Sequence, residues 1–177
     1  MEGSMSFKLR VERIGRVGFA GLMMCLVAPH VGLCQVESTT TTDTLRTAKL
    51  SSSVKGRIYR EMSGEPGTSN GEARSYLEAC PVRFLKLGPD GGMGVRVWGH
   101  DRLCGGTGNC SIWVFDPQTG DLLLSSNGFD FRVETTIHHG RYDILTRANM
   151  SAGTGVRDLY QFDGRTYQHI EQTDETY

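Results

Sequence analysis

From Val82 to the end of the chain, apolar residues tend to alternate with polar ones in short runs that glycine- and aspartate-rich turns separate. A period of two is typical of β-strands with one buried face. The first four runs lie at 82–87, 94–98, 112–115 and 121–124. Turn sequences such as Gly88-Pro89-Asp90-Gly91-Gly92 join them. Short strands joined by tight turns predict an antiparallel sheet.

The chain also resembles itself at an offset of 47 residues. This offset aligns Phe84 with Phe131, Gly106–Gly108 with Gly153–Gly155, and Phe115-Asp116 with Phe162-Asp163. The second unit then has strands near 129–134, 142–145, 158–162 and 166–170. Two units cannot close a propeller, which needs about four blades. We therefore predict a mainly β, antiparallel fold in which two four-stranded units of roughly 47 residues form a sandwich or an open propeller-like fold.

The region before the strands divides into three predicted parts. A short N-terminal helix is expected after Asn70, which can cap it, and Pro81 ends it. Residues 35–70 are rich in Ser and Thr and are predicted to be a disordered leader. One short strand is expected within the leader, at Val54–Tyr59. The β-domain with its disulfide then spans 71–177.

Residues 1–34 have the pattern of a secretory signal peptide. Four basic residues precede an apolar run, and small residues lie three and one positions before a cleavage site at Gln35. A retained membrane anchor is the alternative, but the apolar core from Val17 to Ala28 is shorter than the roughly 20 residues that span a bilayer. We therefore expect a secreted or periplasmic protein with no transmembrane segment in the mature chain.

Cys34 raises a minor alternative, attachment to a lipid. Bacterial lipoprotein signals place a small residue directly before the modified cysteine, and Leu33 departs from that pattern.

Removing the signal peptide leaves three cysteines, Cys80, Cys104 and Cys110. Disulfides persist in the oxidising compartments that exported proteins reach. Cys104 and Cys110 flank a glycine-rich loop that can turn back on itself, so we favour a bond between them. The alternative joins Cys80 to one of the two. A leftover thiol is expected to be buried as a small apolar residue, not catalytic.

The segment from Cys104 to Phe115 reads CGGTGNCSIWVF and resembles the CG-x-x-GNC-x-x-W-x-F segment of uncharacterised secreted bacterial proteins. The YDIL strand at 142–145 and the Y-x-F-D-G-x-x-Y tail at 160–167 are similar to theirs. The resemblance covers residues 82–170. It implies an extracytoplasmic β-domain and carries no established activity. A more distant likeness is to FG-GAP/VCBS-type β-repeats, whose acidic calcium loop this chain lacks.

The sequence offers two candidate binding regions and no recognisable catalytic motif. The first is the loop formed by Gly105, Gly106, Thr107, Gly108 and Asn109. The second is an aromatic face formed by Trp98, Trp113 and Tyr160. Since a strand and not a helix follows the glycine loop, with no lysine, it does not fit a phosphate site.

Other polar residues are assigned structural roles. His138-His139 and the paired Asp116 and Asp163 are expected to be turn residues, so no metal, cofactor or catalytic residue is predicted. The formal net charge of −1 and the lack of a basic stripe argue against nucleic-acid binding.

These observations favour an exported, non-enzymatic β-domain that binds a protein or a glycan ligand in the cell envelope. Two alternatives remain open. One is a hydrolase of envelope polymers with dispersed active-site residues. The other is a secreted inhibitor that inserts its disulfide-closed loop into the cleft of a target enzyme.

Overall fold

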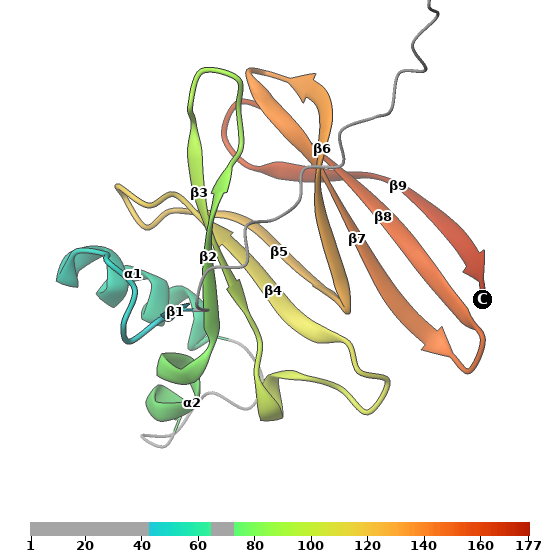
Figure 1. The fold of residues 1–177 in the computed structure, drawn as a ribbon, viewed down its shortest axis with the longest axis horizontal. Coiled ribbons are helices and arrows are strands. Elements are labelled where there is room, and N and C mark those ends of the chain that lie inside the picture. Colours follow the sequence, from blue (N-terminus) through green and yellow to red (C-terminus); the bar gives the residue numbers. More distant parts are fainter. Residues whose placement is uncertain (1–42, 65–72) are drawn as a thin grey trace, which may run out of the picture. The chain divides into compact units, whose positions relative to one another are not determined.

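The computed structural model describes residues 43–64 and 73–177 (Figure 1). The predicted signal peptide, residues 35–42 of the predicted leader and residues 65–72, which include the predicted helix cap Asn70, lie outside these residues. The N-terminal elements are β1 (Asp43–Thr44), α1 (Ser52–Met62) and α2 (Ala73–Ala79). The next strands are β2 (Pro81–Lys86), β3 (Met93–Trp98), β4 (Cys110–Phe115) and β5 (Leu122–Gly128), with a 3-10 helix at Asp101–Leu103. The last are β6 (Asp130–His138), β7 (Arg141–Ser151), β8 (Thr154–Phe162) and β9 (Tyr167–Thr176).

The strands form two antiparallel sheets, which confirms the predicted mainly β fold with two packed sheets. Sheet 1 has the order β1-β2-β3-β4-β5, and sheet 2 has the order β6-β7-β8-β9. Every neighbouring pair is antiparallel, and apart from β1 and β2 the paired strands follow one another directly in strand order along the chain. The chain passes from one sheet to the other at Phe129, between β5 and β6.

Sheet 1 is buried on both faces. Along β4, Trp113 and Phe115 pack into a helix-side cluster with residues of α1 and α2. Their neighbours Ile112 and Val114 pack into an inter-sheet cluster with residues of sheet 2. Successive side chains of a strand point to opposite faces, so β4 separates a layer of helices from the second sheet. The fold therefore has three layers, with helices, sheet 1 and sheet 2 in that order.

Residues 54–59 lie in helix α1, so the prediction of a strand there is wrong. Val54, Ile58 and Met62 are spaced by four residues and are all buried in the helix-side cluster. The spacing places them on one face of a helix. The Ser51 hydroxyl accepts a hydrogen bond from the Val54 N–H and caps the first turn. Residues 43–64 thus contribute to the core, and this part of the predicted leader is ordered.

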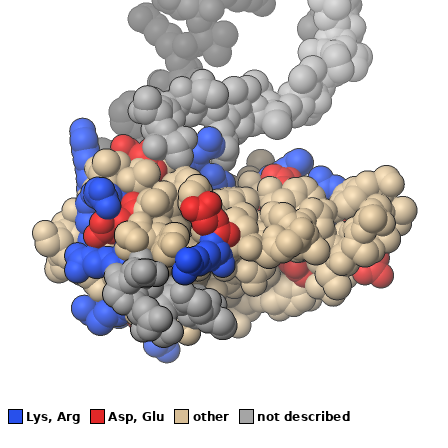
Figure 2. Space-filling view, turned by 90° about the horizontal axis from the view of Figure 1, so that it is seen from below, with Lys and Arg blue, Asp and Glu red and all other residues tan. Residues whose placement is uncertain are grey.

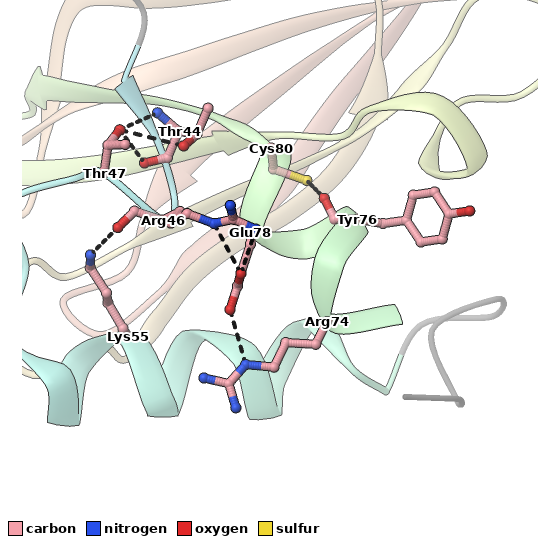
Figure 3. Close-up of polar contacts among 8 residues, drawn as sticks. All are labelled: Thr44, Arg46, Thr47, Lys55, Arg74, Tyr76, Glu78 and Cys80. Carbon is pink, nitrogen blue, oxygen red and sulfur yellow. Dashed lines mark hydrogen bonds and ion pairs between the residues drawn. The ribbon is translucent and has the colours of Figure 1, made fainter. Parts of the chain in front are cut away.

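Polar contacts around Glu78, at the end of α2, link both helices to the segment that follows β1 (Figure 3). The Glu78 carboxylate accepts hydrogen bonds from Arg46 at 3.1 Å and from Arg74 at 3.0 Å. The Lys55 ammonium donates to the Arg46 carbonyl at 2.7 Å, which links α1 to the same group. The two guanidinium groups lower the pKa of Glu78, Arg74 more than Arg46.

This arrangement predicts a pH dependence of stability. Because the pKa of Glu78 is lowered in the folded chain, its contribution is present above the ordinary value of 4.5 and is lost as the pH falls. Thermal unfolding scans between pH 6 and pH 3 should therefore show a smaller acid-induced loss of Tm in Glu78→Gln than in the wild type. Glu61→Gln, at an exposed position of α1, is the control. Equal losses in Glu78→Gln and the wild type would contradict the prediction.

The strands of the two sheets follow the predicted offset of 47 residues. β2 to β5 and β6 to β9 are consecutive four-stranded meanders. Their equivalent turns have the same hydrogen bonds, since Asp116 Oδ1 accepts from two backbone N–H groups and Asp163 Oδ1 accepts from the corresponding two. Both aspartates therefore have the expected turn role. Descent of the two units from one ancestor stays a prediction.

Candidate functional site

The predicted disulfide joins Cys104 and Cys110 and closes the loop between β3 and β4. Among the cysteines that the structure describes, Cys80 is the free thiol, and it is fully buried. Its S–H group donates to the Tyr76 carbonyl at 3.5 Å, and burial raises the pKa of Cys80 to about 11. A thiol with so high a pKa holds little thiolate at neutral pH. Cys80 therefore lies in the core, as expected for the leftover thiol.

The tip of the disulfide loop is attached to sheet 2. The Asn109 side chain donates to the Asn149 carbonyl and accepts from the Asn149 N–H, both at 2.8 Å. The Asn149 side chain in turn donates to the Thr107 carbonyl at 3.0 Å. Asn109 therefore positions the loop, and the exposed part of the predicted binding loop is Gly105–Gly108.

The three residues of the predicted aromatic face do not share a surface. Trp113 is 1% exposed and lies in the helix-side cluster. Trp98 and Tyr160 pack against the inter-sheet cluster on the other face of sheet 1. The Tyr160 hydroxyl is 2.9 Å from the hydroxyl of Ser126 in β5. These aromatic side chains therefore join layers of the fold, and their strand positions exclude one common exposed face.

The two adjacent histidines have different environments. His139 has a φ of 48° and forms the turn with Gly140, as predicted. His138 instead ends β6, and its Nδ1 is 2.7 Å from Oδ1 of Asp143 in β7. Asp143 is only 2% exposed. The prediction of a solvated turn residue is therefore wrong for His138, because the tight turn folds β7 back and brings a buried carboxylate to its ring.

A hollow of about 340 Å³ lies on the face of sheet 2 that points away from sheet 1. Side chains from all four strands of the sheet form it, and we call it the sheet-2 hollow. Its lining consists of Glu134, Thr136, Asp143, Leu145, Arg157, Leu159, Gln161, Glu171 and Thr173. Strand register explains the grouping, because Leu145 is opposite Leu159, and Leu159 is opposite Glu171.

Two irregularities in the strands border the sheet-2 hollow. The pairing of β6 with β7 shifts register between Val133 and Ile137, a segment that contains the lining residues Glu134 and Thr136. The pairing of β8 with β9 shifts beside Leu159, which is also in the lining. Bulges bend a strand and increase its twist. Both register shifts therefore lie among the residues that line the hollow.

The chemistry of the sheet-2 hollow is polar and acidic around an apolar floor. Three carboxylates, from Glu134, Asp143 and Glu171, accompany one guanidinium, from Arg157. By contrast, the helical layer is basic, and Figure 2 shows Lys and Arg side chains gathered over that part of the molecule. The basic residues of this layer are Arg46, Lys49, Lys55, Arg57, Arg60 and Arg74. Among the described lining residues there is no serine or cysteine that could act as a nucleophile.

The sequence does not reveal this site. Its residues are spread over four strands, from Glu134 to Thr173, and only the pairing of the strands brings them together. The sequence contains one signal for the contact between His138 and Asp143. The two residues lie on either side of the tight turn at His139-Gly140, so the hairpin can bring them together.

We expect His138→Ala to lower the free energy of unfolding by about 1 kcal/mol, because it removes a hydrogen-bond partner from buried Asp143. The loss is modest since the His138 side chain is 38% exposed and water can replace the imidazole. Urea denaturation measures the change. The control is His139→Ala, which removes the neighbouring ring and should have less effect. An equal effect of the two substitutions would contradict a specific role for His138.

Across 43–64 and 73–177, no three His, Cys, Asp or Glu side chains come together in a group that could hold a metal ion. The same residues contain no helix with the length and apolar character needed to cross a membrane. No model of a protein family, no curated protein and no solved structure matches this chain.

Proposed function

We propose that this protein is an exported, non-enzymatic β-domain that binds a protein or glycan of the cell envelope with the outer face of sheet 2. The observation that carries the proposal is the sheet-2 hollow. The helices cover the corresponding outer face of sheet 1, whereas the described elements leave this face of sheet 2 open (Figure 1). Binding surfaces typically combine an apolar floor with a few placed polar groups, and the hollow has both.

Export is supported by the disulfide and by the N-terminal pattern of the sequence. The bond between Cys104 and Cys110 is stable in an oxidising compartment and is unusual in a reducing one. The segment around it is also the one that resembles secreted bacterial proteins. The cell envelope or its exterior is therefore the place where we expect the ligand.

The test is capture of envelope components on the immobilised chain, with identification by mass spectrometry and glycan analysis. Leu145→Lys places a charged side chain in the floor of the hollow and should abolish capture of the ligand. Ser125→Lys is the matched control, because it adds the same side chain at an exposed position of sheet 1. Capture that survives Leu145→Lys would overturn the proposal. Loss of capture in Gly106→Lys alone would instead favour the disulfide loop and an inhibitor.

One observation favours a second candidate, a hydrolase of envelope polymers. Asp143, whose carboxylate contacts the His138 ring, shares the lining of the hollow with two further carboxylates, Glu134 and Glu171. A carboxylate pair and a histidine can supply general acid and base groups. Release of soluble fragments from purified envelope polymer would support this candidate if Glu134→Gln and Glu171→Gln both abolished it. Absence of release by the wild-type chain would exclude it for the polymer tested.

A further inference from the structure

Strand β9 forms a long edge of sheet 2. It pairs with β8 on one side, and no described strand pairs with its other side. Seven of its ten residues are exposed. Backbone N–H and C=O groups along an unpaired edge can accept another extended chain. The edge is therefore a surface that an extended segment can occupy.

The Asp and Glu side chains of β9 give the strand a negative charge. Glu171, Asp174 and Glu175 lie in this strand, and no lysine or arginine occurs from 166 to 177. Glu175 forms an ion pair with Arg147 of β7 at 2.7 Å, so the negative charge offered to an added chain depends on Glu171 and Asp174. Antiparallel pairing of two β9 strands from two copies would bring these carboxylates together, and like charges across a strand pair are destabilising. Such an edge disfavours a second copy of itself and attracts a basic chain.

The edge is continuous with the sheet-2 hollow. Glu171 and Thr173 belong to β9 and line the hollow. Side chains alternate between the faces of a strand, so every second residue of a strand added to β9 would lie on the hollow's side of the sheet. Ile170, which is 54% exposed at the irregular part of the strand, offers an apolar contact to the added chain.

From this arrangement we infer that β9 binds an extended, basic peptide segment of a partner protein as a fifth strand of sheet 2. The inference rests on the proposed function and deepens it, because it makes the partner a protein and not a glycan. Backbone hydrogen bonds to β9 provide affinity. Lysine or arginine at alternate positions, beside Glu171 and the acidic hollow, provides selectivity.

The first experiment uses fluorescence anisotropy with the full chain and the peptide (Lys-Val)4 as the probe. We expect binding of (Lys-Val)4 to be at least tenfold tighter than binding of (Glu-Val)4. A (Lys-Val)4 peptide with every amide N-methylated keeps the charge but cannot donate backbone hydrogen bonds, and it should not bind. Equal affinity of the methylated and unmethylated peptides would overturn strand addition. Equal affinity of the basic and acidic peptides would overturn the basic partner.

Two further measurements locate the peptide. Amide hydrogen exchange of β9 should slow when (Lys-Val)4 binds, and protection confined to other strands would overturn the assignment. Glu171→Lys with Asp174→Lys should reverse the preference between (Lys-Val)4 and (Glu-Val)4, and the milder Glu171→Gln should weaken the basic preference. Glu61→Lys makes the same change on α1 and should leave the preference intact. An unchanged preference in all variants contradicts the inference.

The two proposals fail separately. If the chain captures an envelope ligand that Leu145→Lys abolishes, but does not bind (Lys-Val)4, the inference about β9 is wrong and the proposed function remains. If (Lys-Val)4 protects β9 while capture is insensitive to Leu145→Lys, the assignment of the hollow is wrong and the edge remains a binding surface.

Discussion

Trp113→Ala is expected to lower the free energy of unfolding by about 3–5 kcal/mol. The indole is 1% exposed and packs among residues of both the helices and sheet 1. Its loss leaves a cavity between two layers that can collapse only in part. Urea denaturation, followed by far-UV circular dichroism so that the signal does not depend on the missing tryptophan, measures the change.

Trp113→Phe is the control, since it retains an apolar ring at the same position and should cost less. The same experiment separates a core role from a binding role. A residue of a binding face would lose ligand capture at unchanged stability, so that result for Trp113→Ala would contradict its placement in the helix-side cluster.

Loss of the disulfide is the second large effect. The double substitution Cys104→Ser with Cys110→Ser should lower the free energy of unfolding by roughly 2 kcal/mol, because the closed ring no longer restricts the unfolded chain. Asn109 still bonds to β7 in the double variant, so the native loop should keep its position. Denaturation with and without dithiothreitol measures the effect.

The double variant should be insensitive to dithiothreitol, whereas the wild type should weaken by about the same amount when reduced. Asn109→Ala is the companion variant, because it keeps the ring and removes the loop's bonds to Asn149. A wild-type chain whose stability does not change on reduction would show that the bond contributes nothing to folding.

The strands of sheet 1 could be predicted because three local signals agree. Apolar residues alternate in β2 and β3, glycine and aspartate occupy the turns, and the cysteines flank a glycine loop. Sheet 2 was predicted with shorter strands than it has. β7 continues to Ser151, although the sequence predicts only 142–145. From Thr146 to Asn149 the burial still alternates, but the buried positions hold Thr146 and the small Ala148, so the sequence shows no strong apolar pattern there.

Helix α1 was missed although the sequence contains its signal. Val54, Ile58 and Met62 recur every four residues after a capping serine. The surrounding Ser- and Thr-rich composition is typical of a disordered leader, and a run of six residues fits a strand as well as part of a helix. The spacing over eleven residues distinguishes the two, because only a helix places all three side chains on one face.

The candidate site could not be predicted, because its residues become neighbours only through the register in which the strands of sheet 2 pair. The predicted aromatic face was not found for a related reason. The alternation of β4 does not reveal that both of its faces are covered, one by helices and one by sheet 2. Trp113 and Trp98 therefore looked like one surface although they lie in different clusters. The sequence does not show where the register shifts beside the sheet-2 hollow occur.

The order of the strands also has a kinetic consequence. In sheet 2 each strand pairs with the next strand along the chain, so its contacts form between residues that are close in sequence. In sheet 1, β1 pairs with β2, and both helices lie between these two strands in the sequence. The pairing of β1 with β2 therefore joins residues that are distant in sequence. Chains with local contacts fold faster than chains with distant ones. We therefore expect the hairpins of sheet 2 to form early, and β1 and the helices to add late to a sheet that already exists.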